Sequence, residues 1–351
     1  MENPGRREFI KGAALFLVSQ GAWAGSDKVH VELAKKSLKY YIKKGHLPGK
    51  RVLVIGGIHG NEIGAYKSAD LLIDTHIQKG ELIVVPRSNF VSILAKQRGY
   101  NGDMNRKFAS IAPQDPDLPY VTALKELILQ LKPDIVISMH DGVGFHRLNP
   151  HNWGQCVVID EKKYKNFQLY KNALGVVNEA NRSLPPKRHL VVYDTCTFSK
   201  NIHKEQKLAL TGWCLKHDIQ AYCIESSRNL PLLDQIDSHL AMLDAFFDML
   251  GISISPSPTQ MRKDIKSFFP KSSTTLTLQI NSTRHTFTKS SRIKIKKGSN
   301  IKIVDMQGPR GIYLLPKGID LNWNSFFFSK PLDFEMKHDY ERVFKLEVVP
   351  T

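Results

Sequence analysis

The stretch VLVIGGIHGNEIG, residues 52–64, decides the interpretation of the whole chain. It begins as a short apolar run rich in Val and Ile, which predicts a buried strand. The run stops at two glycines, and His59 and Glu62 follow three residues apart, where a helix should begin. Glycines permit a tight strand-to-helix turn, and a spacing of three places both side chains on one face of the first helical turn. The stretch therefore predicts a ligand site at the end of a strand.

A second expected strand supplies another candidate ligand. The run DIVISMH, residues 134–140, ends on His140 and is followed by Asp141. Ligands of open α/β sheets gather beyond the carboxyl ends of the strands, so His59, Glu62 and His140 are expected to meet there. Three such protein ligands leave a fourth position for water, which is typical of a catalytic zinc. We therefore predict a site for one Zn²⁺ ion.

Each of these residues alone also has a plainer explanation. A histidine or carboxylate at a strand end often caps a helix or satisfies a neighbouring polar group, and only the set as a whole favours a metal. Asp141 has two interpretations of the same kind. It orients a metal ligand through a hydrogen bond, or it caps the next turn.

The fold class follows from alternating apolar runs and helical patterns over residues 50–250. The expected strands are 51–57, 81–89, 134–142, 155–161 and 221–227. The expected helices lie near 62–74, 117–132, 162–182, 201–217 and 232–250. Strand–helix alternation of this kind predicts an α/β domain with a mixed central sheet and flanking helices. We place this domain at residues 25–252.

The pattern changes after residue 252. The Ser- and Pro-rich segment SISPSPTQ opens an expected linker, residues 253–270. Beyond it, apolar and polar residues alternate with turn residues between the runs, which predicts a small all-β domain at residues 271–351. Residues 255–351 contain 17 Lys and Arg against 8 Asp and Glu. The basic β domain therefore suits structural support or substrate docking rather than catalysis.

The net charge of the chain is +17, which implies an anionic partner. The basic residues are spread along the sequence, without zinc-finger spacing, a helix-turn-helix signature or an RNA-binding aromatic motif. We therefore expect no nucleic-acid partner. An anionic membrane surface or an acidic polymer fits the charge. The sequence leaves the oligomeric state open.

Residues 1–24 have the features of an export signal. Arg6 and Arg7 precede Phe9, an apolar stretch covers 13–18, and Ala22-Trp23-Ala24 forms a plausible cleavage site. The paired arginines resemble a twin-arginine signal, with an ordinary secretory signal or an uncleaved amphipathic segment as the alternatives. The apolar part is too short to span a bilayer, and no later stretch qualifies. We expect a periplasmic protein without a membrane span.

The four cysteines form no C-x-x-C pair, which argues against a structural zinc ribbon. An oxidising compartment would permit one or two disulfides. Buried free thiols are the simpler interpretation for most of Cys156, Cys196, Cys214 and Cys223.

Four motifs together resemble the carboxypeptidase A-like zinc carboxypeptidases, the funnelins. They are GGIHGNE, DMNR (103–106), SMHDG (138–142) and CIES (223–226). The resemblance covers about residues 50–250 and depends on the set rather than on any one motif. It implies that His59, Glu62 and His140 are the zinc ligands, as their positions at the strand ends also suggest.

The same resemblance implies roles for further residues. Asn105 and Arg106 match the clamp for a C-terminal carboxylate, and Arg98 is expected to polarise the scissile carbonyl. Glu225 matches the catalytic glutamate, a group able to take a proton from water and pass it to the leaving amine. In the resembling enzymes that act on peptidoglycan, the region of Thr211 helps to bind the diaminopimelate end of the substrate, which implies a substrate-binding role for Thr211. Surface or packing roles remain the alternatives for Arg98, Glu225 and Thr211.

The coupling of this domain to a β domain and an export signal resembles the peptidoglycan-trimming carboxypeptidases of helical bacteria. Members of that subgroup set cell shape by cutting the stem tripeptide at the D-Glu–meso-diaminopimelate bond, leaving a dipeptide. Some replace the first zinc-ligand histidine by glutamine, whereas this chain has His59. Some also carry a third domain, which is not evident here.

Two other functions compete with this interpretation. Zinc-dependent N-acyl-amino-acid hydrolases, such as aspartoacylase and succinylglutamate desuccinylase, also show HGNE and a downstream Asn-Arg pair. An export signal argues against them, because their pathways are cytoplasmic. A non-catalytic wall-binding protein on a degenerate enzyme fold is the other alternative, and the complete set of candidate residues argues against it.

Overall fold

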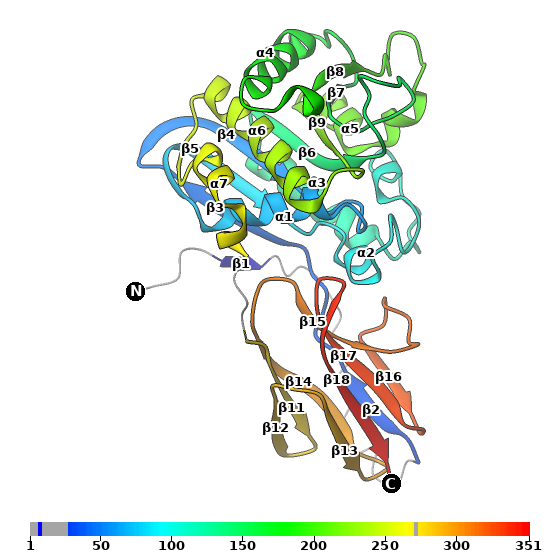
Figure 1. Ribbon diagram of the computed structural model, residues 1–351. Coiled ribbons are helices and arrows are strands. Elements are labelled where there is room, and N and C mark those ends of the chain that lie inside the picture. The colour runs from blue at the N-terminus through cyan, green and yellow to red at the C-terminus, as the bar shows by residue number, and fades with distance from the viewer. Residues whose placement is uncertain (1–5, 9–26, 270–272) are drawn as a thin grey trace. The chain divides into compact units, whose positions relative to one another are not determined.

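The computed structural model describes residues 6–8, 27–269 and 273–351 (Figure 1). This part of the chain forms two compact units. The first unit contains residues 6–8 and 37–269, and the second contains residues 27–36 and 273–351. The expected export signal falls outside the described residues except at 6–8.

The first unit is built on one mixed sheet. Its strands run in the order β1-β3-β5-β4-β6-β9-β7-β8, with β10 paired to β5. Strands β5, β4, β6 and β9 are parallel neighbours, whereas β3 and β7 run antiparallel to β5 and β9. The strands are β1 (Arg6–Glu8), β3 (Lys39–Lys44), β4 (Leu47–Ile55), β5 (His76–Val85), β6 (Ile135–Gly142), β7 (Cys156–Ile159), β8 (Val191–Asp194), β9 (Gln220–Ser227) and β10 (Ser253–Ser255).

Helices flank this sheet, as the sequence predicts, so the mixed α/β fold class is confirmed. Helices α1 and α4 both pack against the long helix α6 (Figure 1). The helices are α1 (Ile63–Leu71), α2 (Phe90–Ala95), α3 (Leu118–Leu131), α4 (Leu169–Asn181), α5 (Leu210–Lys216), α6 (Leu232–Leu250) and α7 (Pro258–Lys263). Short 3₁₀ helices are η1 (Leu72–Asp74), η2 (Met104–Arg106), η3 (Pro186–Arg188), η4 (Lys204–Leu208) and η5 (Ile265–Phe268).

Along the central strands, alternate side chains point to opposite faces of the sheet, with mostly apolar residues on one face and mostly polar residues on the other. One set of alternate residues of β6 and β9 belongs to the buried core with α6: Ile135, Ile137, Met139, Tyr222 and Ile224. The rings of Tyr222 and Phe246 of α6 lie 5.1 Å apart. Because successive residues of a strand point to opposite faces, the polar residues between them face away from α6: Ser138, His140, Cys223 and Glu225.

The turn between β4 and α1 depends on close backbone packing. Strand β4 ends at Ile55, and Gly57 adopts a positive φ of 72°. A Cβ on Gly60 would overlap the backbone of Ser92 and Ile93 in α2. The sequence did not predict α2, so it did not indicate that this glycine admits a neighbouring helix.

Residues 253–270, expected to form a linker, differ from that expectation over the described range. Strand β10 places Ile254 beside Ile77 of β5, and Met261 of α7 is buried in the core. Ser257 caps α7 and Pro258 occupies its first turn. The Ser- and Pro-rich composition therefore marks a helix start, where proline is well accommodated, rather than an unstructured break.

The second unit consists of two packed β-sheets. One sheet has the order β12-β11-β14-β2-β16, and the other has the order β13-β18-β17-β15. Phe326 and Phe328 of the first sheet contact Phe334 of the second. The strands are β2 (Val29–Glu32), β11 (Thr275–Ile280), β12 (Thr283–Phe287), β13 (Ser291–Ile295), β14 (Asn300–Gln307), β15 (Ile312–Pro316), β16 (Ser325–Phe328), β17 (Leu332–His338) and β18 (Glu341–Pro350).

Strand β2 was not anticipated as part of this unit. Its residues precede residues 37–269 of the first unit, yet it pairs with β14 on one side and β16 on the other. Val29 and Val31 are fully buried in the β unit. The expected start of the first domain at residue 25 therefore differs from the division seen in the structure.

The structure also bears on the cysteines and on the expected absence of a membrane span. The four cysteines are free thiols, with Cys156 and Cys214 buried. In the described chain, no helix combines the length and the apolar character needed to cross a membrane.

Gly60 provides a test of the packing around the first turn. We expect Gly60→Ala to lower the free energy of unfolding by about 3 kcal/mol, because the added methyl group must displace the backbone of α2. Gly175→Ala is the matched control, since a Cβ there in helix α4 meets nothing within 4 Å. That change should raise stability by about 0.5–1 kcal/mol. Urea denaturation of both variants checks this, and equal stabilities would contradict it.

Candidate active site

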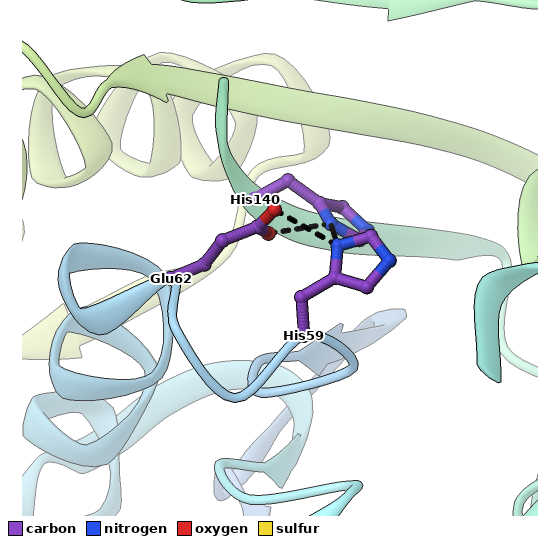
Figure 2. Close-up of side chains that lie close together, drawn as sticks. All are labelled: His59, Glu62 and His140. Carbon is purple, nitrogen blue, oxygen red and sulfur yellow. Dashed lines mark hydrogen bonds and ion pairs between the residues drawn. The ribbon is translucent and has the colours of Figure 1, made fainter. Parts of the chain in front are cut away.

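Three predicted ligands converge where β4 and β6 end (Figure 2). Nδ1 of His59 lies 2.9 Å from one carboxylate oxygen of Glu62, and Nδ1 of His140 lies 2.8 Å from the other. The two Nδ1 atoms are 3.0 Å apart. All three residues are only 2% exposed. Within the described residues, this is the group of His, Cys, Asp and Glu side chains that could hold a metal ion.

The geometry of this group fits a metal. Each residue offers one ligand atom, and these three atoms lie within 4.8 Å of one another, so imidazole nitrogens and a carboxylate oxygen are gathered where one ion could bind them all. Burial, as the largest effect, and the nearby charges of His59 and Arg98 lower the pKa of His140, which favours the neutral imidazole that binds metals. Glu62 pulls the other way without reversing the shift. Burial opposes ionisation of Glu62, but the two histidines hold its pKa well below the ordinary value.

Polar partners orient both imidazole rings from behind. Nε2 of His59 lies 2.9 Å from a carboxylate oxygen of Asp103, and Nε2 of His140 lies 2.9 Å from the Ser138 hydroxyl. Burial alone would raise the pKa of Asp103, yet its hydrogen bond with His59 and the charges of two arginines hold that pKa far below the ordinary value. Such partners fix the ring that presents its other nitrogen to a metal. Asp103 and Ser138 lie within the motifs DMNR and SMHDG, although no role was predicted for them.

Asp141 does not contact the His140 ring as an orienting partner. Its carboxylate accepts a hydrogen bond from the backbone N–H of Ala65 in the first turn of α1, at 3.1 Å. The other oxygen lies 2.8 Å from Nε2 of His239 in α6. The capping interpretation is therefore the one that agrees with the structure, although the capped helix is α1.

A cavity of about 480 Å³ opens beside the three ligands. All eight residues singled out from the sequence line it: His59, Glu62, Arg98, Asn105, Arg106, His140, Thr211 and Glu225. The structure thus brings together residues that are up to 166 positions apart, from 59 to 225.

The polar residues of the DMNR segment lie at the edge of this cavity. Arg98 pairs with Asp103 at 3.0 Å, and its guanidinium lies 3.3 Å from Glu62. The side-chain oxygen of Asn105 accepts a hydrogen bond from the backbone N–H of Leu210, at the start of α5. Arg106 forms a hydrogen bond with the carbonyl oxygen of Asn105, at 3.0 Å. Two guanidinium groups therefore reach a cavity beside the candidate metal ligands, where an anionic ligand would be attracted.

Glu225 lies directly opposite His140 in the pairing of β9 with β6. It is 7% exposed, and its Oε2 atom is buried without a hydrogen-bond partner. The Cys223 thiol donates to its other oxygen at 3.5 Å. Burial, together with repulsion from Glu62 and Asp141, raises the pKa of Glu225 well above the ordinary value. This carboxyl group is therefore suited to exchange a proton with a molecule in the cavity.

Sequence reasoning missed several other residues of the cavity wall: Asp160, His203, Glu205 and Arg228. Asp160 lies near the end of the expected strand 155–161 and directly after the observed β7, much as His140 ends another expected strand. The rule that polar residues at strand ends form sites could therefore have found it. His203 and Glu205 lie within the expected helix 201–217, where they resemble ordinary polar residues of an exposed helix face, so the sequence carried no comparable signal for them.

Comparisons with known proteins agree with this geometry. Residues 15–265 match the family model for the catalytic region of carboxypeptidases controlling helical cell shape. The apo structure of the cell shape determinant protein Csd4 from Helicobacter pylori is 24% identical, with a TM-score of 0.67 over 90% of this chain and 76% of that chain. Its tripeptide-bound structure is 24% identical, with a TM-score of 0.66 over 90% and 77%. Its mDAP-bound form, described as a D,L-carboxypeptidase, is 23% identical, with a TM-score of 0.65 over 89% and 76%.

A search of curated protein sequences found no match. At these identities the solved structures establish the shared fold. The family match spans every candidate site residue and confirms the resemblance to metallocarboxypeptidases of helical bacteria. Such an enzyme implies a metal, and the His-Glu-His group is a place for it. The chain therefore belongs to the family of carboxypeptidases that control helical cell shape.

Proposed function

We propose that this protein is a periplasmic zinc carboxypeptidase that trims peptidoglycan stem peptides. The reaction is cleavage of the D-Glu–meso-diaminopimelate bond of the tripeptide, which leaves a dipeptide. The observation that carries the proposal is the His59–Glu62–His140 group beside a cavity lined by arginines and by Glu225, whose Oε2 atom has no hydrogen-bond partner. Membership of the cell-shape carboxypeptidase family and the positive net charge support a wall substrate.

Binding and orientation come from the residues at the cavity edge. Arg106 and Asn105 hold the free carboxylate of the C-terminal residue, since a guanidinium and an amide can donate several hydrogen bonds to it. Arg98 lies beside the candidate ligands and stabilises negative charge that develops on the scissile carbonyl oxygen. A requirement for a free terminal carboxylate makes the enzyme an exopeptidase.

Zinc is the metal we propose for His59, Glu62 and His140, and when bound it supplies a Lewis acid that makes water more acidic and the carbonyl more electrophilic. Oε2 of Glu225 takes the proton of the attacking water. The same oxygen then gives a proton to the leaving amine of the C-terminal residue. Burial away from competing donors keeps this oxygen available for both transfers.

The N-terminal arginine pair, Arg6 and Arg7, supports export by the twin-arginine route. That route carries folded proteins, so a metal acquired before export would be retained. An N-acyl-amino-acid hydrolase would use a similar set of groups, but the match to the carboxypeptidase family favours the peptidase.

The proposed reaction is tested with purified muropeptides. Zinc-loaded protein should convert muramyl tripeptide to dipeptide and release diaminopimelate, as followed by mass spectrometry. A chelator should stop the reaction, and added zinc should restore it. If zinc-loaded protein leaves all muropeptides unchanged but hydrolyses N-acyl amino acids, the deacylase is the correct function.

Substitutions separate metal binding from proton transfer. Glu225→Gln should lower kcat by about 10²–10⁴-fold, because it removes the proton acceptor, while the zinc content stays unchanged. His59→Ala should instead lower the zinc content, measured by elemental mass spectrometry. Unchanged turnover in Glu225→Gln would exclude this residue as the general base.

If Arg106 binds the terminal carboxylate, its removal should lower kcat/KM only for substrates that have a free carboxylate. Arg106→Ala should lower kcat/KM for the tripeptide by about 10- to 100-fold, because a charge-assisted hydrogen bond is lost. The same change should have little further effect on a tripeptide amide, which lacks the anionic end. Arg147→Ala is the control, since Arg147 is exposed and does not line the cavity. Equal losses on both substrates would argue for a structural role of Arg106.

A further inference from the structure

Asp160 is a buried carboxylate in the cavity wall for which the proposed mechanism has no use. It follows strand β7, is 4% exposed and lines the cavity. The Thr197 hydroxyl donates a hydrogen bond to it at 3.0 Å, and the Thr211 hydroxyl donates another. Thr211 is the residue that the sequence resemblance linked to substrate binding, and the structure joins it to Asp160.

No basic side chain compensates this carboxylate in the described chain. Its hydrogen bonds come from neutral hydroxyls, and its charged neighbours Glu161 and Asp194 are also acidic. Burial, together with these neighbours, raises the pKa of Asp160 to about 6. The adjacent Glu161 differs, because backbone N–H groups of Phe198 and Ser199 saturate its carboxylate. A buried carboxylate is normally paired, so a cation brought by a ligand would complete the environment of Asp160.

The strand register places Asp160 deep in the cavity, away from the candidate metal ligands. His140 and Glu225 form one cross-strand row, and Ser138, Cys223 and Val158 form the next row on the same face. Asp160 lies two residues beyond Val158. At about 3.3 Å per strand residue, it is about 13 Å from the level of Glu225. Only a long side chain, with its polar group at the far end, spans that depth from the scissile bond.

The proposed carboxylate clamp and Asp160 lie around the same turn of chain. The side chain of Asn105, next to Arg106, accepts the backbone N–H of Leu210, and the following residue, Thr211, donates to Asp160. One residue of a substrate can therefore place its terminal carboxylate at Arg106 and its side chain toward Asp160.

We propose that Asp160 binds a side-chain ammonium group of the substrate's C-terminal residue and so selects a diamino acid. This inference rests on the proposed carboxypeptidase function and assigns its specificity to one residue. An acidic side chain would be repelled by Asp160, and an apolar one would leave the carboxylate buried without a counter-ion. The side chain of diaminopimelate ends in an ammonium group beside a carboxylate, and the ammonium group supplies the counter-ion for Asp160 while it offsets the charge of that carboxylate.

The test compares two tripeptides that differ only in this ammonium group. One ends in meso-diaminopimelate, and the other ends in 2-aminopimelate, which keeps the distal carboxylate and lacks the distal ammonium. The wild-type zinc enzyme should favour the first by about 10- to 100-fold in kcat/KM, the range expected for a hydrogen bond to a charged group. Asp160→Asn should reduce this preference to within about threefold, mainly through KM.

Asp194→Asn is the matched control, because it removes the same charge near Asp160 from a residue outside the cavity wall. It should keep the wild-type preference. Dissociation constants of both peptides are also measured in proteins that carry Glu225→Gln, which bind the peptides without hydrolysing them. These constants give the same comparison of Asp160→Asn with its control in the absence of turnover.

The outcomes separate the two proposals. Equal binding of both peptides by the wild-type protein would overturn the role of Asp160 and leave the carboxypeptidase function intact. Equal losses for both peptides in Asp160→Asn would overturn it as well, because they indicate a structural role. If neither peptide is hydrolysed, the proposed function fails, while a preference for the diamino peptide in binding still supports the assignment of Asp160.

Discussion

The carboxylate of Glu62 lies between two histidine rings, and much of the first unit serves that arrangement. One oxygen faces His59 and the other faces His140, although the two rings come from different strand ends. Two ring nitrogens 3.0 Å apart repel each other unless a proton or a cation lies between them. The fold must therefore hold three buried polar groups together against their preference for water. A cation at this point reverses that penalty, because it satisfies all three at once.

The two faces of the sheet have different roles in holding these groups in place. On one face, alternate residues of β6 and β9 join the apolar core with α6, which fixes both strands. On the other face, the intervening residues carry the candidate chemistry. A shift of either strand by one residue would exchange the two sets. The packing of residues such as Tyr222 on Phe246 therefore sets the position of Glu225 opposite His140, without any contact with a substrate.

The site was more predictable from sequence than its surroundings, for a physical reason. His59, Glu62 and His140 follow local rules about strand ends, so their meeting could be inferred. The need for glycine at position 60 arises from the close approach of α2, and the position of β2 arises from pairing with strands more than 260 residues later. No local sequence pattern reveals either contact. Asp160 is also a polar residue at a strand end, a pattern that indicates a place in a site. Its strand runs antiparallel to β9, so it lies deep in the cavity rather than with the metal ligands.

Strand β2 has a consequence for how the chain is assembled. It is synthesised before residues 37–269, yet it is an interior strand of a sheet whose other members follow those residues. Residues 37–269 are thus inserted, in sequence, between the two segments that form the β unit. Until residues 300–328 are made, β2 has both edges unpaired and its buried valines exposed to water. The β unit can therefore complete its fold only after residues 37–269 have been synthesised, so the order of synthesis lets this part of the first unit fold before it.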